Sequence, residues 1–277
     1  TTHDGWYFVM LLFRGLAIET ALIVQQVFHI PLRQTEGFLA SILKRIGSDR
    51  KAPDFSTLSI RGQTLPIHIR VRSIRNEPLH IVIDSTGAKV YGEGEWKVRQ
   101  HGWSKRRTWK KLHIGIDELT QDILLGEVTD NSTADCEMLD PLLKQLPESA
   151  EIEQVSLDGA YDKHICYEIL RKRDINHTAI PPQRNAKIWQ HGNSRKTRLT
   201  RDENLRRIRT IGRKRWKQES NYHRRSLVET AMFRLKTIFT DKVHARTPAN
   251  QRIQLLLRCK ALNYMTTLGM PMSYVVA

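Results

Sequence analysis

The sequence contains few cysteines, and they lie far apart. Only Cys136, Cys166 and Cys259 occur in 277 residues. An odd number at such long spacing provides neither a disulfide framework nor a zinc-binding pattern. A small disulfide-stapled secreted domain and a zinc module are therefore excluded, and a reducing cytoplasm is the expected compartment.

A long uninterrupted hydrophobic run is also missing. The most apolar stretch, residues 6–28, is broken by Arg14, Glu19, Gln25 and Gln26. It therefore predicts a buried amphipathic helix rather than a membrane span, and no membrane partner is expected. No basic start or small-residue cleavage site marks a signal peptide. The chain begins at Thr1 rather than Met, which indicates an incomplete N-terminus.

Acidic residues are scarce relative to basic ones. The sequence has 29 Asp and Glu against 45 Lys and Arg, which gives a net charge of +16. Residues 183–225 hold fifteen bases and three acids, and residues 97–111 hold seven bases and no acid, with Trp96, Trp103 and Trp109 interleaved. Clustered positive charge favours a nucleic-acid partner. The alternative is a basic surface without a nucleic-acid role, as in some ribosome-associated or secreted proteins.

The first part of the chain has helical periodicity. Ala17, Ala21, Val24 and Phe28 share one predicted stripe, and Pro31 ends that helix. A second helix ends at Gly47, and a third begins near Asp54 or Ser56, either of which could cap it. Three short helices with basic ends suit a helix-turn-helix-like DNA module. A helical bundle that only supports another domain fits equally well.

From residue 79 onward the pattern changes to strands. Residues 79–84, 112–117, 123–128, 155–158 and 177–180 are short apolar runs, and the second and third are separated by a polar turn. Helices are expected over 132–146, 162–173, 222–239 and 248–268. This succession predicts an α/β fold with a mixed sheet flanked by helices.

Two of the predicted strands end in an acid followed by a small-residue turn. Asp84 precedes Ser85 to Gly87, and Asp158 precedes Gly159 and Ala160. Sites assemble at this edge of open α/β sheets, and two carboxylates brought together there need a cation between them. Oxygen ligands favour Mg²⁺ or Mn²⁺. Each acid alone also fits a turn former or a helix cap.

A third acid lies on the predicted helix 222–239. At about 100° per residue, Tyr222, Arg225, Glu229 and Lys236 fall within about 60° of one another, with apolar residues on the other side. Glu229 could complete a metal site while Arg225 and Lys236 hold phosphates. The alternative is a solvated helix face with internal ion pairs.

The remaining polar candidates each have a structural alternative. His113 could face the site but is more typical of a structural histidine, and Asp117 suits the hairpin turn. Asp162 is expected to cap its helix. The three tryptophans could stack on unpaired bases or pack in the core. The segment 183–217 could be a DNA-clamping insertion or a disordered basic loop that orders on DNA.

Taken together, the acids and their neighbours resemble the bacterial insertion-sequence transposases of the Asp-Asp-Glu type. The resemblance is carried by Ile83 to Gly87, Leu157 to Asp162, and the Tyr-Arg-Glu-Lys signature of Tyr222, Arg225, Glu229 and Lys236. Residues 31–38, 90–96 and 105–113 are similar to the insertion sequence five family. Members of the family begin further upstream, and residues 1–13 do not resemble them.

This resemblance implies a ribonuclease H-like catalytic core. Residues 1–66 would form an N-terminal helical, helix-turn-helix-like region, and residues 74–277 the catalytic domain with a basic insertion at 183–220. Asp84, Asp158 and Glu229 would bind Mg²⁺, or Mn²⁺, and catalyse cleavage. Tyr222, Arg225 and Lys236 would grip the element end.

The expected partners are the terminal inverted repeats, the target DNA and a second copy of the chain. Further DNA contacts are expected from Arg206, Arg207, Arg213 and Arg215 within the basic insertion. A homodimer on DNA is expected because two ends must be paired. The alternatives are a related nuclease or recombinase, and a catalytically silent DNA-binding relic of a transposase.

Overall fold

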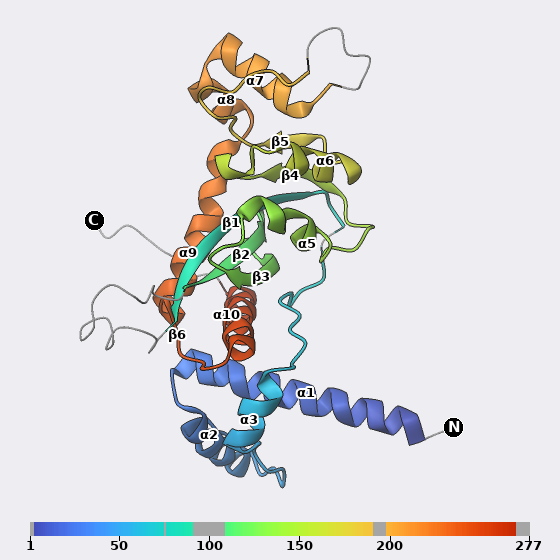
Figure 1. The fold of residues 1–277 in the computed structure, drawn as a ribbon. Coiled ribbons are helices and arrows are strands. Elements are labelled where there is room, and N and C mark those ends of the chain that lie inside the picture. Colours follow the sequence, from blue (N-terminus) through green and yellow to red (C-terminus); the bar gives the residue numbers. More distant parts are fainter. Residues whose placement is uncertain (1–2, 75, 91–108, 191–197, 270–277) are drawn as a thin grey trace, which may run out of the picture. The chain divides into compact units, whose positions relative to one another are not determined.

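The computed structural model describes residues 3–74, 76–90, 109–190 and 198–269 (Figure 1). They divide into two compact units. The first takes in residues up to 69, the stretch 88–110 and everything from 235, and the second takes in 70–87 and 111–234. The C-terminal helix therefore groups with the N-terminal helices.

The first unit is mainly helical. Its principal helices are α1 (His3–Phe28), α2 (Leu32–Arg45), α3 (Phe55–Gly62) and α10 (Pro248–Leu268). Asp54 caps α3 by accepting from the amides of Ser56 and Thr57, and Thr247 caps α10 by accepting from the amide of Asn250. These satisfied amides explain where both helices begin. The predicted helices of the N-terminal region are confirmed.

The buried stripe of α1 differs from the predicted one. Ile18, Ala21 and Leu22 are buried and pack against Leu58 of α3 and against α10, whereas Ala17 and Phe28 are exposed. The predicted stripe is therefore wrong at Ala17 and Phe28, because helical spacing alone does not decide which side of a helix faces its neighbours. Only Ala21 belongs to both stripes.

Polar residues of α1 are buried against matching groups of α10. Glu19 pairs with Lys260, and Oε1 of Gln26 accepts from Nε2 of Gln254 at 3.1 Å and from Nε of Arg258 at 2.9 Å. Two of the polar residues that interrupt the apolar stretch, Glu19 and Gln26, therefore have partners in the protein interior. Among the described residues, no single helix is long and apolar enough to cross a membrane. The residues Gly15–Phe28 of α1 and the helix α2 reach that length and hydropathy only when they are taken together, and the chain bends by 110° between them.

A six-stranded sheet carries the rest of the fold. Its strands are β1 (Leu79–Val90), β2 (Trp109–Asp117), β3 (Ile123–Asp130), β4 (Ile152–Ser156), β5 (His177–Ala179) and β6 (Lys242–Val243). The order is β3-β2-β1-β4-β5, with β6 paired to the last residues of β1. β4 runs parallel to β1 and to β5. β2 and β3 are neighbours in the sheet, joined by a short turn, and form the predicted hairpin. β6 was not predicted, because two residues give no periodic signal.

The core of the second unit lies between the sheet and two helices, α5 (Leu139–Leu143) and α6 (His164–Lys172). Ile81 and Ile83 of β1 are fully buried there with Leu142 and Leu170. The helix predicted over 132–146 is shorter than expected. It begins as the 3₁₀ turn η1 (Asp135–Met138), because Pro141 cannot donate to a carbonyl in the preceding turn.

Residues 200–219 of the basic segment are mainly helical. They form α7 (Thr200–Ile211) and α8 (Arg213–Glu219), joined by Gly212 at a φ of +84°, which a side chain would disfavour. The hypothesis of a disordered loop is therefore wrong for residues 198–219. The chain then passes through the 3₁₀ turn η3 (Tyr222–Arg225) into α9 (Ser226–Phe239).

Candidate active site

Asp84 and Asp158 are aligned by the register of two parallel strands. The last pair between β1 and β4 is Val82 with Ser156. Two residues further along, Asp84 and Asp158 occupy corresponding positions at the edge where the pairing stops. β1 continues to Val90, so Asp84 lies within a strand rather than at its end. The prediction of two acids at neighbouring strand ends is corrected in that detail only.

Asp84 is mostly buried and hydrogen-bonded on both oxygens. Oδ1 accepts from the amide of Ser85 at 2.8 Å, and Oδ2 accepts from Nη1 of Arg225 at 2.8 Å. Burial nevertheless raises the pKa of Asp84, and the charges of Asp158 and Glu229 raise it further. The three acids are therefore within reach of mutual repulsion.

Asp158 caps a short turn as well as lying beside Asp84. Its Oδ1 accepts from the amide of Ala160 at 2.8 Å, at the start of the 3₁₀ turn η2 (Gly159–Tyr161). The interpretation of this residue as a cap is thus confirmed. It is compatible with a role in a site, because one oxygen suffices for the cap.

Arg225 joins the first acid to the third. It bonds Asp84, as above, and through Nη2 it bonds Glu229 one helical turn further along. The alternative of an internal ion pair on this helix face is therefore present in the structure. Because Arg225 bonds both acids, the carboxylate of Glu229 is linked to that of Asp84 through one guanidinium. The Glu229 side chain is 52% exposed.

Metal-binding geometry is not formed in this arrangement. The described part of the chain holds no group of three or more His, Cys, Asp or Glu side chains positioned around one metal ion. The donor chemistry does fit, because three carboxylates are the ligands that hard divalent cations prefer. Arg225 occupies the space between two of them, so it would have to move for Asp84 and Glu229 to share an ion.

Tyr222 and Arg225 both belong to the 3₁₀ turn η3, so neither lies on α9. The turn follows Asn221 in the left-handed conformation at φ 53°, and α9 begins only at Ser226. The predicted single stripe from Tyr222 is therefore wrong at its start. The Arg225 guanidinium lies 5.9 Å from the centre of the Tyr222 ring, so the two still form one cluster.

The predicted apolar back of α9 is confirmed. Val228, Ala231, Met232, Leu235 and Phe239 are buried. Lys236 is exposed on this helix. The hydrophilic side of α9 is therefore exposed and does not pack in the core, as the amphipathic pattern predicts.

The four arginines predicted to bind DNA lie on α7 and α8, and most are engaged in ion pairs. Arg206 bonds Glu203 at 2.6 Å, and Arg207 makes a bidentate pair with Glu219 at 2.9 and 3.0 Å. Arg215 also lies 3.5 Å from Glu219. Arg213 is partly exposed and donates to the carbonyl of Gln183 at 3.4 Å.

A buried ionic network fixes this helical pair to the turn after Asp158. Arg201 of α7 bonds Asp162 at 2.7 Å and Asp202 at 3.3 Å, and all three side chains are at most 4% exposed. The Arg201 guanidinium lies 3.6 Å from the centre of the Trp189 ring. Asp162 was predicted to cap α6, but the cap position is Lys163 and Asp162 pairs with Arg201 instead. Nothing in the local sequence distinguished these residues from other charges of the segment.

The remaining polar candidates, Asp117 and His113, have partners within the described residues. Asp117 closes the β2–β3 turn by accepting from the amide and hydroxyl of Thr120, as predicted. His113 is fully buried, and its Nε2 lies 2.9 Å from the hydroxyl of Thr129. Trp109 is half-buried at the start of β2. Trp96, Trp103 and most of the basic stretch 97–111 lie outside the described residues.

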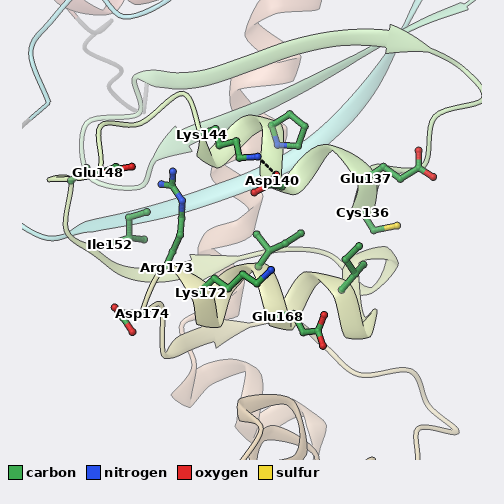
Figure 2. Close-up of a pocket in the computed structure, with 14 residues that line it drawn as sticks. Cys136, Glu137, Asp140, Lys144, Glu148, Ile152, Glu168, Lys172, Arg173 and Asp174 are labelled. Atoms are coloured by element: carbon green, nitrogen blue, oxygen red, sulfur yellow. Dashed lines mark ion pairs between the residues drawn. The ribbon is translucent and has the colours of Figure 1, made fainter.

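A groove elsewhere in the second unit is a poor candidate for the site. It encloses about 1010 Å³ between α5 and α6, and Figure 2 shows the Asp140–Lys144 ion pair on one side and Glu168 and Lys172 on the other. Asp84, Asp158 and Glu229 do not line it. Five acids and three bases do, which is an unsuitable charge for binding phosphates.

The fold and the acids define a class of protein. A β3-β2-β1-β4-β5 sheet with two acids at matching positions on neighbouring parallel strands, and a third on a later helix, is consistent with a ribonuclease H-like core. Residues 75–264 match a family model described as a transposase DDE domain, and residues 8–93 match a second model of the same description. The chain belongs to the DDE transposase family. It is thus a DNA transposase, a polynucleotidyl transferase, and the family implies a DNA substrate and a divalent metal.

Proposed function

We propose that this transposase cleaves phosphodiester bonds at the ends of an insertion sequence and joins those ends to target DNA. In this proposal Asp84, Asp158 and Glu229 are the catalytic acids and hold Mg²⁺. The sequence motifs favour the insertion sequence five family. A homodimer would assemble on the DNA, because both ends of the element must be held together.

The observation that carries the proposal is the arrangement of the three acids. The β1–β4 register brings Asp84 level with Asp158, and Arg225 connects Asp84 to Glu229. The pKa of Asp84 is raised first by burial and to a smaller extent by the other two acids, and perturbed pKa values of this kind cluster at functional sites.

The roles of the residues follow from their charge and position. When bound, divalent ions would activate the attacking oxygen and stabilise the leaving oxygen. The three carboxylates would hold those ions and balance their charge. Tyr222, Arg225 and Lys236 would bind phosphates next to the cleaved bond, and the arginines of α7 and α8 would bind the DNA backbone further away.

The test is cleavage of a DNA duplex that carries one end of the element, with Mg²⁺ present and absent. Asp84→Ala and Glu229→Ala should abolish cleavage and leave DNA affinity almost unchanged. Asp130→Asn, which changes an exposed acid at the end of β3, is the matched control and should cleave normally.

Cleavage that survives either alanine substitution would exclude these acids as the catalytic set. A wild-type protein that binds DNA but gives no product at any metal concentration would support the silent DNA-binding relic. Cleavage that ignores the end sequence would support a general nuclease instead.

A further inference from the structure

Two lysines of α8 carry charges that no acid balances within the described part of the chain. Every arginine of α7 and α8 either pairs with an acid or donates to a backbone carbonyl. The described residues provide neither kind of partner for Lys214 or Lys217. Lys214 is exposed, whereas Lys217 is partly buried. A charge that loses water without gaining a partner is costly, so the Lys217 ammonium is suited to bind an anion.

The contact that Lys217 does make is with an aromatic ring. Its Nζ lies 5.0 Å from the centre of the Tyr222 ring, and the guanidinium of Arg225 lies 5.9 Å from the same centre. The face of a tyrosine ring attracts a cation without neutralising it. Tyr222 therefore orients the ammonium of Lys217 while leaving its charge and its N–H donors available to an anion.

The position of Lys217 is fixed by the contacts of α8. The side chain of Trp216, the preceding residue, is 2% exposed, so this helix is packed against the rest of the unit. Three residues after Lys217, the carbonyl of Ser220 accepts from Nε2 of Gln154 at 2.9 Å. Gln154 belongs to β4, the strand that leads to Asp158. The end of α8 is therefore tied to a strand that carries one of the three acids.

Tyr222 connects Lys217 to the acids from the other side. The charges of Arg225, Asp158 and Asp84 all act on the Tyr222 hydroxyl, and Arg225 bonds Asp84 at 2.8 Å. An anion held by Lys217 beside this ring would therefore lie next to the carboxylates. Carboxylates repel an anion unless cations flank it, and Lys217 and Arg225 provide two such cations.

We propose that Lys217 binds a DNA phosphate next to the cleaved bond, in one cluster with Tyr222 and Arg225. The inference rests on the proposed function, because the cleaved bond defines where that phosphate lies. It separates Lys217 from the arginines of α7 and α8, whose pairs with acids and carbonyls hold them on the protein in the absence of DNA. Within the basic segment, the local sequence does not distinguish this lysine from its neighbours.

The experiment combines Lys217→Gln with methylphosphonate substitutions, each of which removes the charge of one phosphate near the boundary of an element-end duplex. Affinity is measured by fluorescence anisotropy without a divalent ion, so that no strand is cut. Lys217→Gln should weaken binding of unmodified DNA by about 10-fold, as expected for a lost hydrogen bond to a charged group. One methylphosphonate next to the cleavage position should weaken binding of the wild type but not of Lys217→Gln, because both changes remove the same contact.

Lys214→Gln is the matched control, since it removes the same charge from the same helix at a residue without a contact to the Tyr222 ring. This control should stay as sensitive to that methylphosphonate as the wild type, and Lys217→Arg should restore the affinity. Independent effects of Lys217→Gln and of every methylphosphonate would overturn the phosphate contact. A matching phosphate far from the boundary would overturn its placement. If the wild type binds the duplex but does not cut it with Mg²⁺, the proposed function fails, while the binding scan still decides whether Lys217 holds a phosphate at the boundary.

Discussion

Arg225 and Asp84 are joined by a hydrogen bond of 2.8 Å between Nη1 and Oδ2, within a cluster that also includes Glu229. A guanidinium therefore lies between two of the three proposed metal ligands. It balances carboxylates that would otherwise repel each other, so the cluster can stay formed without a metal ion. The same charge competes with any divalent ion that enters.

This competition predicts that Arg225→Gln binds divalent ions more tightly. Removing the guanidinium leaves Asp84 and Glu229 without their cation, so we expect the Kd for Mn²⁺ to fall by about 10-fold, equal to about 1.4 kcal/mol. Titration followed by electron paramagnetic resonance measures this. Arg224→Gln is the control, since Arg224 pairs with Glu118 at 2.9 Å. Equal Mn²⁺ affinity in the wild type and in Arg225→Gln would contradict the competition.

The pKa of Asp84 predicts how pH affects stability. Because burial raises this pKa above its ordinary value of 3.8, the native state holds the proton more tightly than the unfolded chain. The protonated Asp84 side chain thus contributes most to the free energy of unfolding below pH 3.8, and this contribution is lost as the pH rises through the raised pKa of the folded protein. Asp84→Asn should therefore raise Tm by a few degrees near pH 7, with a gain that shrinks toward pH 4. Thermal unfolding across this range measures it, with Asp130→Asn as control. A gain that is independent of pH would contradict the argument.

The buried network of Arg201 predicts a large loss of stability. Arg201→Met would leave the carboxylates of Asp162 and Asp202 buried without their shared partner. Breaking a buried ion pair in this way costs about 3–5 kcal/mol. Urea unfolding and limited proteolysis of residues 181–220 should both detect the change. The control is Arg207→Gln, which breaks an exposed ion pair with Glu219 and should change the free energy of unfolding little. Similar losses of stability in both variants would contradict the prediction that burial makes the Arg201 network the more important one.

The arginines of α7 and α8 predict the salt dependence of DNA binding. Neutralising Arg206, Arg207, Arg213 and Arg215 together should flatten the plot of log affinity against log salt by about 0.9 for each phosphate that is no longer neutralised. Filter binding or fluorescence anisotropy at several salt concentrations measures the slope. An unchanged slope would mean that these residues do not contact phosphates.

Glu219→Gln tests the same surface in the opposite direction. Glu219 holds Arg207 in a bidentate pair and lies 3.5 Å from Arg215. Releasing both arginines should tighten DNA binding and steepen the salt dependence. Weaker binding would indicate that the pairs orient the arginines for DNA rather than occupy them.

The sequence predicted a structural feature well where that feature is caused by residues a few positions apart in the chain. The start of α3 could be predicted because its cap, Asp54, acts within three residues. The hairpin turn at Asp117 and the apolar back of α9 are equally local. The prediction failed where a local feature was overlooked or misjudged, as with Pro141 in the helix 132–146 and Tyr222 before the start of α9.

The sequence by itself determined the positions of the three acids, the basic segment and the order of the first five strands along the chain, because apolar periodicity, charge clustering and acid-ending strands are properties of neighbouring residues. Only the tertiary structure decided which charges meet. Arg225 bonds Asp84 across 141 positions of the chain, and Arg201 bonds Asp162 across 39. Such partners are selected by strand register and by the cost of burying a charge alone, and neither is fixed before the sheet has formed.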